Sequence, residues 1–328
     1  MPVRNIVYLF GAGATHAEML NIEAGPSANF RNQHGLLISD VSKRVMKAAQ
    51  QKTSFRKDLE LVSSPQGSLN IELLISLIST SQIHDSDAKA NTLKQLVKRD
   101  IEAQLTKGRK QRFYLHKALF ELHELIKNRE QVLAVISLNY DDVLDEALAA
   151  NGEAFDYCHT LKDTGELPLL KLHGSFNWIS MRPYGRRRRM SIIPLGIQKN
   201  YLSPPYNFIW SKALDLLVRC DVLRIIGCSL NQNDVGLVDL LFKAHLERTS
   251  PLEIEIIDFQ PQGDVIKGSY GFFPRIFKPT EVEDALIKGE LIEDPSRGGN
   301  PFKIWLGAKA HKMVEDDIPK TRFLRKCC

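Results

Sequence analysis

The stretch IVYLFGAGATH, residues 6–16, decides how the rest of the chain can fold. Ile6 to Phe10 is a short apolar run of the kind that forms a strand buried on both faces of a sheet. Gly11 and Gly13 follow at once, and glycine lets the backbone turn sharply and approach a ligand closely. A helix that begins here would direct its free N–H groups and the positive end of its dipole to one place, where a phosphate can bind. Taken alone, the stretch fits equally well a strand-to-turn junction that binds nothing, because His16 stands where the dinucleotide pattern has Gly or Ala.

The composition is that of a folded globular chain. Its 328 residues are 43% hydrophobic and 25% charged, which argues against a mainly disordered protein. The net charge of +5 is too small to indicate a nucleic-acid-binding protein, and the run Arg186–Arg189 is interpreted as a solvated loop, with docking of nucleic acid or an acidic partner as the alternative. No apolar run reaches the roughly 18 residues of a membrane helix, and the first residues carry no signal-peptide cleavage site. We therefore expect a cytoplasmic protein without membrane contact and without direct nucleic-acid binding.

The cysteines argue against a structural zinc site. Five are present, and none forms a CxxC pair: Cys158, Cys220, Cys228, Cys327 and Cys328. An odd number in a chain expected to be cytoplasmic predicts free thiols rather than disulfides.

The hydrophobic pattern after the glycine turn predicts alternating strands and helices. Residues 17–31 have loop composition, residues 36–130 carry helical stripes, and residues 175–205 are predicted to be irregular. Further strands are predicted at Val132–Ser137, Leu169–Leu172, Val222–Ile226 and Ile254–Ile257. Helices are predicted from Val143 to Asn151, over Ala213–Val218 and over Val235–Leu246.

This alternation predicts an α/β fold with a Rossmann-like, doubly wound parallel sheet and a helical insertion after the first strand–helix unit. We divide the chain into three parts. Residues 1–31 and 131–265 form the Rossmann-like domain, residues 32–130 the helical insertion module, and residues 266–328 a C-terminal extension.

Polar residues follow each of the predicted strands. Besides the glycine turn, they are Asn139 with Asp141, His173, Ser229 after Gly227, and Asp258. The carboxyl ends of parallel strands meet at one edge of a sheet, which is where such sheets bind ligands. Each residue has an ordinary alternative, since Asn139 and Asp141 could cap a helix and His173 could be a buried packing histidine. Their shared location favours a ligand site.

The order of these clusters resembles the sirtuin superfamily. The matching segments are Gly11–Thr15, Asn29–Arg31, Leu138–Asp141, His173–Gly174, Gly227–Ser229 and Asp258. Sirtuin deacetylases carry four zinc-binding cysteines between the His-Gly and Gly-x-Ser segments, whereas residues 175–226 contain only Cys220. The pattern therefore looks like the zinc-free bacterial branch of the superfamily, whose members hydrolyse NAD and often act as effectors in anti-phage defence.

The resemblance implies that NAD+ is the substrate and that Asn139 and His173 are the catalytic pair. Asn139 both donates and accepts hydrogen bonds without changing charge, so it can orient a water molecule and the ribose. A histidine side chain can accept a proton in general base catalysis, which is the role expected of His173. The expected NAD-binding residues are Gly11, Ala12, Gly13, Ala14, Thr15, Arg31, Asp141, Gly227, Ser229 and Asp258. Of these, the backbone around Ala12 to Ala14 would hold the pyrophosphate, with Arg31 as a second phosphate contact.

Hydrolysis would release nicotinamide and ADP-ribose, and zinc is not expected. Two other functions stay open at this point: an NAD-dependent protein deacylase or ADP-ribosyltransferase, and a non-catalytic sensor that binds NAD or ADP-ribose and signals to a partner. An unregulated NAD hydrolase would deplete the NAD of its own host. We therefore expect a homo-oligomer, or a complex with a regulatory or sensor protein encoded nearby.

Overall fold

A computed structural model of the chain describes residues 3–22, 35–52, 55, 63–64, 67–68, 70–81, 85–111, 115–180, 189–192, 201–228, 230, 234–250 and 252–257. The strands of its main sheet are β1 (Arg4–Phe10), β4 (Glu130–Ser137), β5 (Phe155–Asp156), β6 (Leu167–Lys171), β9 (Val222–Ile226) and β10 (Glu253–Ile257). The helices are α1 (Ala12–Ile22), α3 (Ile38–Gln50), α5 (Ile71–Thr80), α6 (Ser86–Gln111), α7 (Leu115–Ile126), α8 (Val143–Ala150), α9 (Tyr206–Arg219) and α10 (Val235–Glu247). Two small antiparallel pairs join β2 (Ser63–Ser64) to β3 (Gly67–Ser68) and β7 (Gly174–Ser180) to β8 (Arg189–Ile192).

The main sheet is parallel throughout and has the strand order β10-β9-β1-β4-β6-β5. From the central strand β1 the chain builds β4, β5 and β6 on one side, then crosses back to build β9 and β10 on the other. The direction of winding therefore reverses between β1 and β9. The helices that follow these two strands, α1 and α10, cover opposite faces of the sheet, and sheets of this kind bind ligands at such a reversal. The predicted α/β class with a doubly wound parallel sheet is confirmed.

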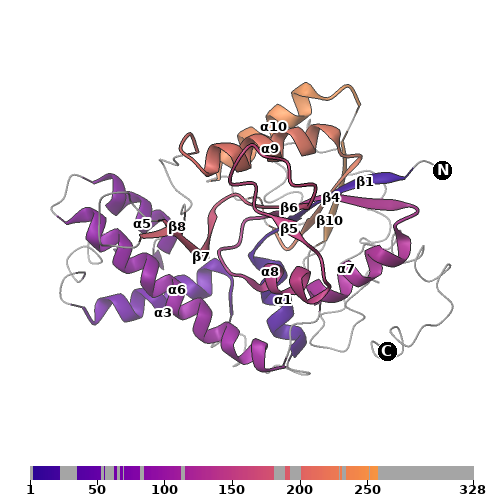
Figure 1. Ribbon diagram of the computed structural model, residues 1–328. Helices are drawn as coiled ribbons and strands as arrows, with labels where there is room; N and C mark the ends of the chain where they lie inside the picture. The colour runs from indigo at the N-terminus through magenta and orange to yellow at the C-terminus, as the bar shows by residue number, and fades with distance from the viewer. Residues whose placement is uncertain are drawn as a thin grey trace.

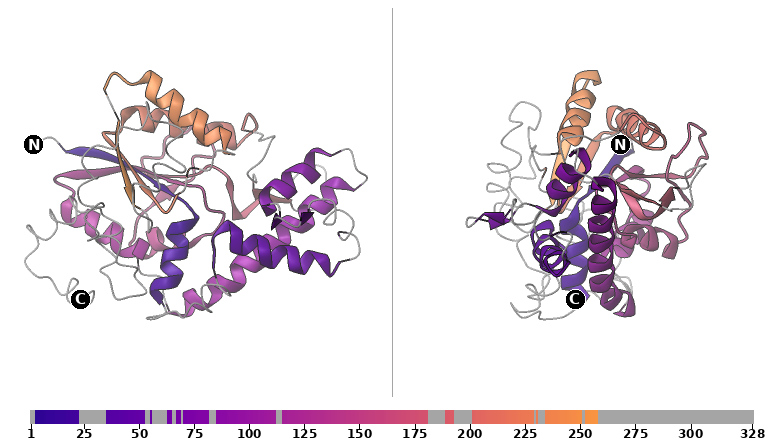
Figure 2. Two further views of the ribbon diagram at one scale, coloured as in Figure 1. Left: turned by 180° about the vertical axis from the view of Figure 1, so that it is seen from behind. Right: turned by 90° about the vertical axis from the view of Figure 1, so that its left-hand side faces the viewer.

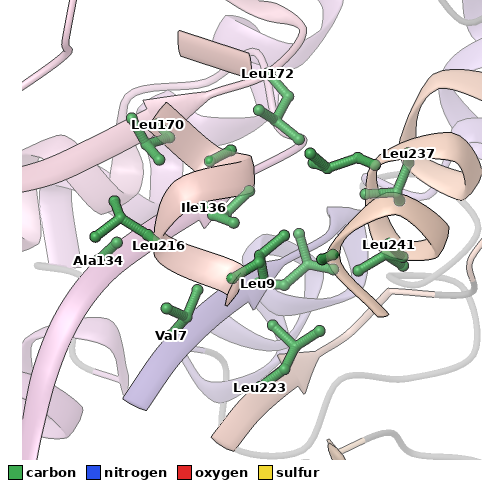
Figure 3. Close-up of a cluster of buried hydrophobic side chains, with 14 of the residues drawn as sticks. Val7, Leu9, Ala134, Ile136, Leu170, Leu172, Leu216, Leu223, Leu237 and Leu241 are labelled. Carbon is green, nitrogen blue, oxygen red and sulfur yellow. The ribbon is translucent and has the colours of Figure 1, made fainter. Parts of the chain in front are cut away.

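Helices cover both faces of the sheet, with α9 and α10 on one face and α1, α7 and α8 on the other (Figure 1). The central strand supplies both layers, because its side chains alternate between faces. Val7 and Leu9 pack against Leu216 of α9 and Leu241 of α10 (Figure 3). Ile6, Tyr8 and Phe10 belong to the opposite layer, which includes Leu119 of α7. The residues from 6 to 10 are at most 1% exposed, which explains why this strand is a continuous apolar run.

The helices α3, α5 and α6 form a separate cluster beyond the β7–β8 pair (Figure 2). Their buried side chains, among them Val45, Ile75 and Leu93, pack against Phe176 of β7 and Ile192 of β8. Helix α7 behaves differently, because its Leu119 and Phe120 belong to the apolar layer on the sheet. The division of the chain into three parts stays a prediction.

Two local predictions are wrong. Residues 17–22, predicted as loop, continue α1, because Ala17 and Met19 are buried on the inner side of that helix. Residues 175–205, predicted as irregular, include β7 and β8, and the buried side chains of Phe176 and Trp178 give β7 the two-residue period of a strand. Arg189 begins β8, whereas Arg186 to Arg188 lie outside the described residues.

A buried ionic cluster joins residues of β9, β10, β4 and β1. Arg224 of β9, fully buried, lies 2.5 Å from the carboxylate of Glu255 on β10 and 3.2 Å from that of Glu130 on β4. It also donates to the hydroxyl of Tyr8 on β1 at 2.7 Å, and that hydroxyl bonds His123 of α7. Burial lowers the pKa of His123 to about 3, so this histidine is neutral.

Within the described residues, no helix is long and apolar enough to cross a bilayer.

The loops after β1 and β9 touch backbone to backbone. The Gly11 N–H donates to the carbonyl of Ile226 at 3.0 Å, and the Gly13 N–H donates to that of Gly227 at 2.8 Å. A Cβ on Gly11 would lie 2.5 Å from the Gly227 oxygen, and one on Gly227 would lie 2.2 Å from the Ala14 nitrogen. No side chain fits between these loops, so the glycines are required for the two strand ends to meet.

The substitution Gly227→Ala should destabilise the protein well beyond its effect on backbone conformation. Gly227 and Gly152 have φ values of +58° and +75°, but nothing lies within 4 Å of a Cβ at Gly152. Gly152→Ala is the control, because both substitutions place a side chain on a left-handed backbone and lose stability for that reason. Only Gly227→Ala adds a steric clash, which commonly costs about 1–3 kcal/mol of unfolding free energy. Urea unfolding of both variants measures the difference in unfolding free energy, and equal losses would show that the close contact is not as described.

Candidate functional site

The predicted site residues follow one row of paired strand residues. Phe10 of β1 pairs with Ile226 of β9 on one side and with Ser137 of β4 on the other, and Ser137 pairs in turn with Lys171 of β6. Gly11, Asn139, His173 and Gly227 each come one or two residues after this row. The sheet therefore brings the carboxyl-terminal ends of four strands, and the residues that follow them, to a single edge.

Four of the predicted residues form one hydrogen-bonded chain across this edge. Asn139 donates through Nδ2 to the carbonyl oxygen of Gly11 and to the hydroxyl oxygen of Thr15, both at 3.0 Å. The Thr15 hydroxyl in turn donates to the carboxylate of Asp141, at 3.2 Å from Oδ2. Thr15 is 2% exposed and Asn139 is half-buried. The loop after β4 is thus fastened to the first turn of α1.

The helix-capping alternative also holds for part of this loop. Oδ1 of Asp141 accepts from the Val143 N–H at 3.1 Å, which ties Asp141 to the start of α8. Asp142 occupies the N-cap position itself, but its side chain makes no capping hydrogen bond. Asp141 therefore has both roles, since one carboxylate accepts from the helix backbone and from Thr15.

The start of α1 offers fewer backbone donors than the sequence suggests. The Gly13 N–H is taken by the Gly227 carbonyl, and the Ala14 N–H donates to the carbonyl of Gly11 at 3.0 Å. Ala12 is exposed at the first position of the helix, and the first turn carries no acidic residue. An anion here would interact with the positive end of the helix dipole, near the exposed residue Ala12. It would not bind the N–H groups of Gly13 and Ala14, which already donate to backbone carbonyls.

Burial controls the charge of Asp141. This side chain is 9% exposed, and burial raises the pKa of its carboxyl group above the ordinary value. The ammonium of Lys171 opposes the rise most strongly, followed by the hydrogen bond from the Val143 N–H.

His173 lies at the same edge with a carboxylate beside it. Its Nε2 is 2.9 Å from Oδ2 of Asp234, and both side chains are 3% exposed. The rings of Tyr140 and Trp210 flank the imidazole, with centroids 6.4 Å and 6.5 Å away. The other oxygen of Asp234 accepts from the Leu237 N–H at 3.3 Å, so the cap of α10 also holds the acid next to His173. The sequence offers either Asn233 or Asp234 as the cap of the helix that begins at Val235, and nothing in the spacing marks Asp234 as the partner of His173.

The helical cluster also reaches this edge, through a contact that the sequence does not reveal. Tyr140 stands between Asn139 and Asp141, and its hydroxyl donates to Glu72 of α5 at 2.8 Å. Tyr140 and Glu72 are both buried, and the ring of Tyr140 packs on Phe176 with 5.6 Å between centroids. The loop that carries Asn139 is therefore held from the sheet side and from the helical side.

Three predicted binding residues, Arg31, Ser229 and Asp258, lie outside the described residues.

Two cavities formed wholly by described residues lie away from the candidate site. One, of about 350 Å³, is beside His123, and the other, of about 220 Å³, is beside Cys158. Cys158, Cys220 and Cys228 are buried free thiols. Among the residues that the structure describes, no three His, Cys, Asp or Glu side chains are grouped to hold a metal ion.

Comparison with known proteins yields one match by sequence. Residues 133–249, which run from β4 to the end of α10, match the family model described as "SIR2-like domain". This range contains Asn139, Asp141, His173 and Asp234. No curated protein matches the chain. The predicted resemblance to sirtuins is supported at the level of this domain, and the NAD-hydrolysing branch stays a prediction.

Similar solved structures include three Sir2 complexes. The first holds the inhibitor EX-527, 2'-O-acetyl-ADP-ribose and a deacetylated p53 peptide, with 14% identity over 87% of this chain and 92% of that chain and a TM-score of 0.41. The second, with a p53 peptide and NAD+, has 14% identity over 87% and 92% and a TM-score of 0.40. The third, a mutant Sir2 homologue with ADP-ribose, has 15% identity over 87% and 90% and a TM-score of 0.37.

The raised pKa of Asp141 predicts how stability changes with pH. The folded protein holds this proton more tightly than the unfolded chain, so the cost of ionising Asp141 is absent at low pH and complete above its folded pKa. The substitution Asp141→Asn removes that titration. The unfolding free energy of the wild type minus that of the variant should therefore fall as the pH rises from 3.8, the ordinary value, through the raised pKa. Denaturant unfolding across this range tests it, and a difference that is constant or grows with pH would contradict it.

Proposed function

We propose that this chain, whose residues 133–249 match a SIR2-like domain, is an NAD+ hydrolase that releases nicotinamide and ADP-ribose. The observation that carries the proposal is the hydrogen-bonded chain of Gly11, Asn139, Thr15 and Asp141 at the point where the sheet reverses its winding, with His173 after the adjacent strand. Dinucleotides bind in sheets of this kind at that reversal. The assignment of Asn139 as a catalytic residue rests on the fixed orientation of its side-chain amide.

Cleavage of the nicotinamide bond builds positive charge on the ribose and releases a neutral base. A water oxygen forms the new bond to C1′, the electrons of the C1′–N bond leave with nicotinamide, and one proton of the water must be taken up. The Nδ2 group of Asn139 is held by Gly11 and Thr15, so the amide plane is set before substrate arrives. Its carbonyl oxygen can accept from the attacking water without any change of charge.

His173 is the candidate proton acceptor. A base takes a proton more readily when a carboxylate stabilises the cation that forms, and Oδ2 of Asp234 lies 2.9 Å from its Nε2. Both side chains are buried, where the interaction between opposite charges is stronger than in water. Asp141, kept close to Thr15, is the candidate acceptor for the carboxamide of nicotinamide.

Phosphate binding is assigned to the opposite end of the site. The positive end of α1 would face the pyrophosphate, with Gly11 to Ala14 allowing close approach. Gly227 would shape the floor, and Arg31, Ser229 and Asp258 would complete the phosphate and ribose contacts. Zinc has no part in this chemistry.

The biological role that fits is that of a toxic effector, which depletes NAD in the cytoplasm during bacterial anti-phage defence. This part rests on the resemblance of the sequence clusters to the zinc-free sirtuin-like branch. An enzyme of that kind must be silent until it is triggered, so control by self-association or by a sensor protein encoded nearby belongs to the same proposal.

Substitution of Asn139 by Ala should abolish nicotinamide release while leaving the fold intact. Loss of one preorganised polar group at a reaction centre commonly costs about 100-fold or more in turnover. A matched control is Asn151→Ala, because Asn151 also donates a hydrogen bond to a backbone carbonyl, that of Lys117, but at the far end of α8. Chromatography of NAD incubations, with the chain alone and with the products of neighbouring genes, measures free nicotinamide.

Each alternative function has its own outcome in that assay. Unchanged turnover by Asn139→Ala would contradict the assignment of the catalytic residue. NAD consumption that requires an acylated peptide or an acceptor protein would indicate a deacylase or an ADP-ribosyltransferase. Binding of NAD or ADP-ribose with no nicotinamide release under any condition would indicate a sensor.

A further inference from the structure

Lys171, the last residue of β6, is a fully buried lysine two positions before His173. Lysines are almost never fully buried unless they are paired, because removing an ammonium group from water is costly. The chemistry proposed for Asn139 and His173 does not use this group. A buried charge this close in sequence to the candidate site needs a structural explanation.

The ammonium group of Lys171 joins two parts of the neighbouring strand–helix unit. Its Nζ donates to the backbone carbonyl oxygen of Asp141 and lies 3.0 Å from Oδ2 of Asp145, in the first turn of α8. Asp145 also accepts from the hydroxyl of Tyr157 and, at 3.5 Å, from Asn177. The acid is therefore held by segments beyond β6 and α8. Lys171 pins the Asp141 backbone to this fixed point.

We propose that Lys171 is a positioning residue of the NAD site, which clamps the Asp141 carbonyl to Asp145 and so fixes the loop that presents Asn139 and Asp141. This inference rests on the proposed function, since it concerns the same site. Lys171 touches neither substrate nor reacting atoms. It acts through the backbone of the loop and through its charge.

The charge of Lys171 gives the clamp a second effect. Burial pushes Asp141 towards its protonated form, and Lys171 is the strongest opposing influence on its pKa. A protonated Asp141 would be a weaker acceptor towards Thr15 and towards substrate, because one of its oxygens would carry a proton and act as a donor. The groups that face Asp141 from the surrounding elements are Thr15 of α1, His116 of α7 with its partner Glu18, Asp145 of α8 and Lys171 of β6. Asp145 acts in the opposite direction to Lys171, but more weakly.

A double substitution separates positioning from simple stabilisation. Lys171→Met alone leaves the Asp145 carboxylate buried without its cation, which is strongly destabilising. In Lys171→Met/Asp145→Leu both charges are gone, so the unfolding free energy should recover most of that loss. The Asp141 carbonyl, however, still lacks its donor. Lys212→Met is the control, because Lys212 is not fully buried and its ion pair is a long one of 3.8 Å to Asp163, whose side chain is 79% exposed.

The experiment measures stability, kcat, KM and the pH dependence of nicotinamide release for these variants. We expect the double variant to regain stability over Lys171→Met and yet keep kcat at least about tenfold below the wild type, with the acid limb of its pH profile moved to higher pH. The Lys212→Met variant should match the wild type. Recovery of kcat together with stability, or an unmoved acid limb, would overturn the positioning role.

The outcome for the wild type distinguishes this inference from the proposed function. If the wild type releases no nicotinamide, alone or with its neighbouring gene products, hydrolysis fails as the function, and affinity for NAD then becomes the readout. In that case the double variant should bind NAD at least about tenfold more weakly than the wild type by calorimetry. Equal affinity, or no binding by the wild type, would overturn the inference.

Discussion

The loops that follow β1 and β9 meet backbone to backbone, and the position of the candidate site depends on that contact. Only glycine permits it, because a Cβ at Gly11, Gly13 or Gly227 would lie under 3 Å from the opposing backbone. The hydrogen bond from Gly13 to Gly227 joins the loops after two neighbouring parallel strands, at the point where the strand order reverses. The N–H groups of Gly11 and Gly13 donate to the carbonyls of Ile226 and Gly227 and are not free to bind a phosphate. The glycines therefore set the geometry of the candidate site more than they provide groups that bind NAD.

Charged and polar groups outside this contact hold the candidate catalytic side chains in place. Asp234 stands beside His173, Lys171 anchors the backbone of Asp141, and Glu72 binds the tyrosine between Asn139 and Asp141. They come from α10, β6 and α5, so three separate elements fix the orientation of one edge. Such buried polar groups stabilise a fold only when each has a partner, and here the partners are the loops that the proposed chemistry needs.

The sequence predicts the parallel sheet well, because buried strands read as continuous apolar runs and each is followed by a glycine or a polar residue. It also places Asn139 and His173 at one edge, since strand ends in a parallel sheet share an edge. It cannot predict that Asp234 and Lys171 belong to the site, because a helix cap and a strand-end lysine look ordinary until tertiary packing brings them to His173 and Asp141. The β7–β8 pair is missed although Ser175 to Trp178 alternate between polar and apolar residues, because that alternation is short and is followed by a stretch rich in Arg, Gly and Pro.

The central claim is that NAD lies across the reversal between β1 and β9, and a crystal structure of the inactive Asn139→Ala variant grown with NAD tests it most directly. We predict an intact dinucleotide with its pyrophosphate at the start of α1, beside Ala12, and its nicotinamide ribose between position 139 and His173. Density for NAD at the cavity beside His123, or no bound NAD at saturating concentration, would contradict it.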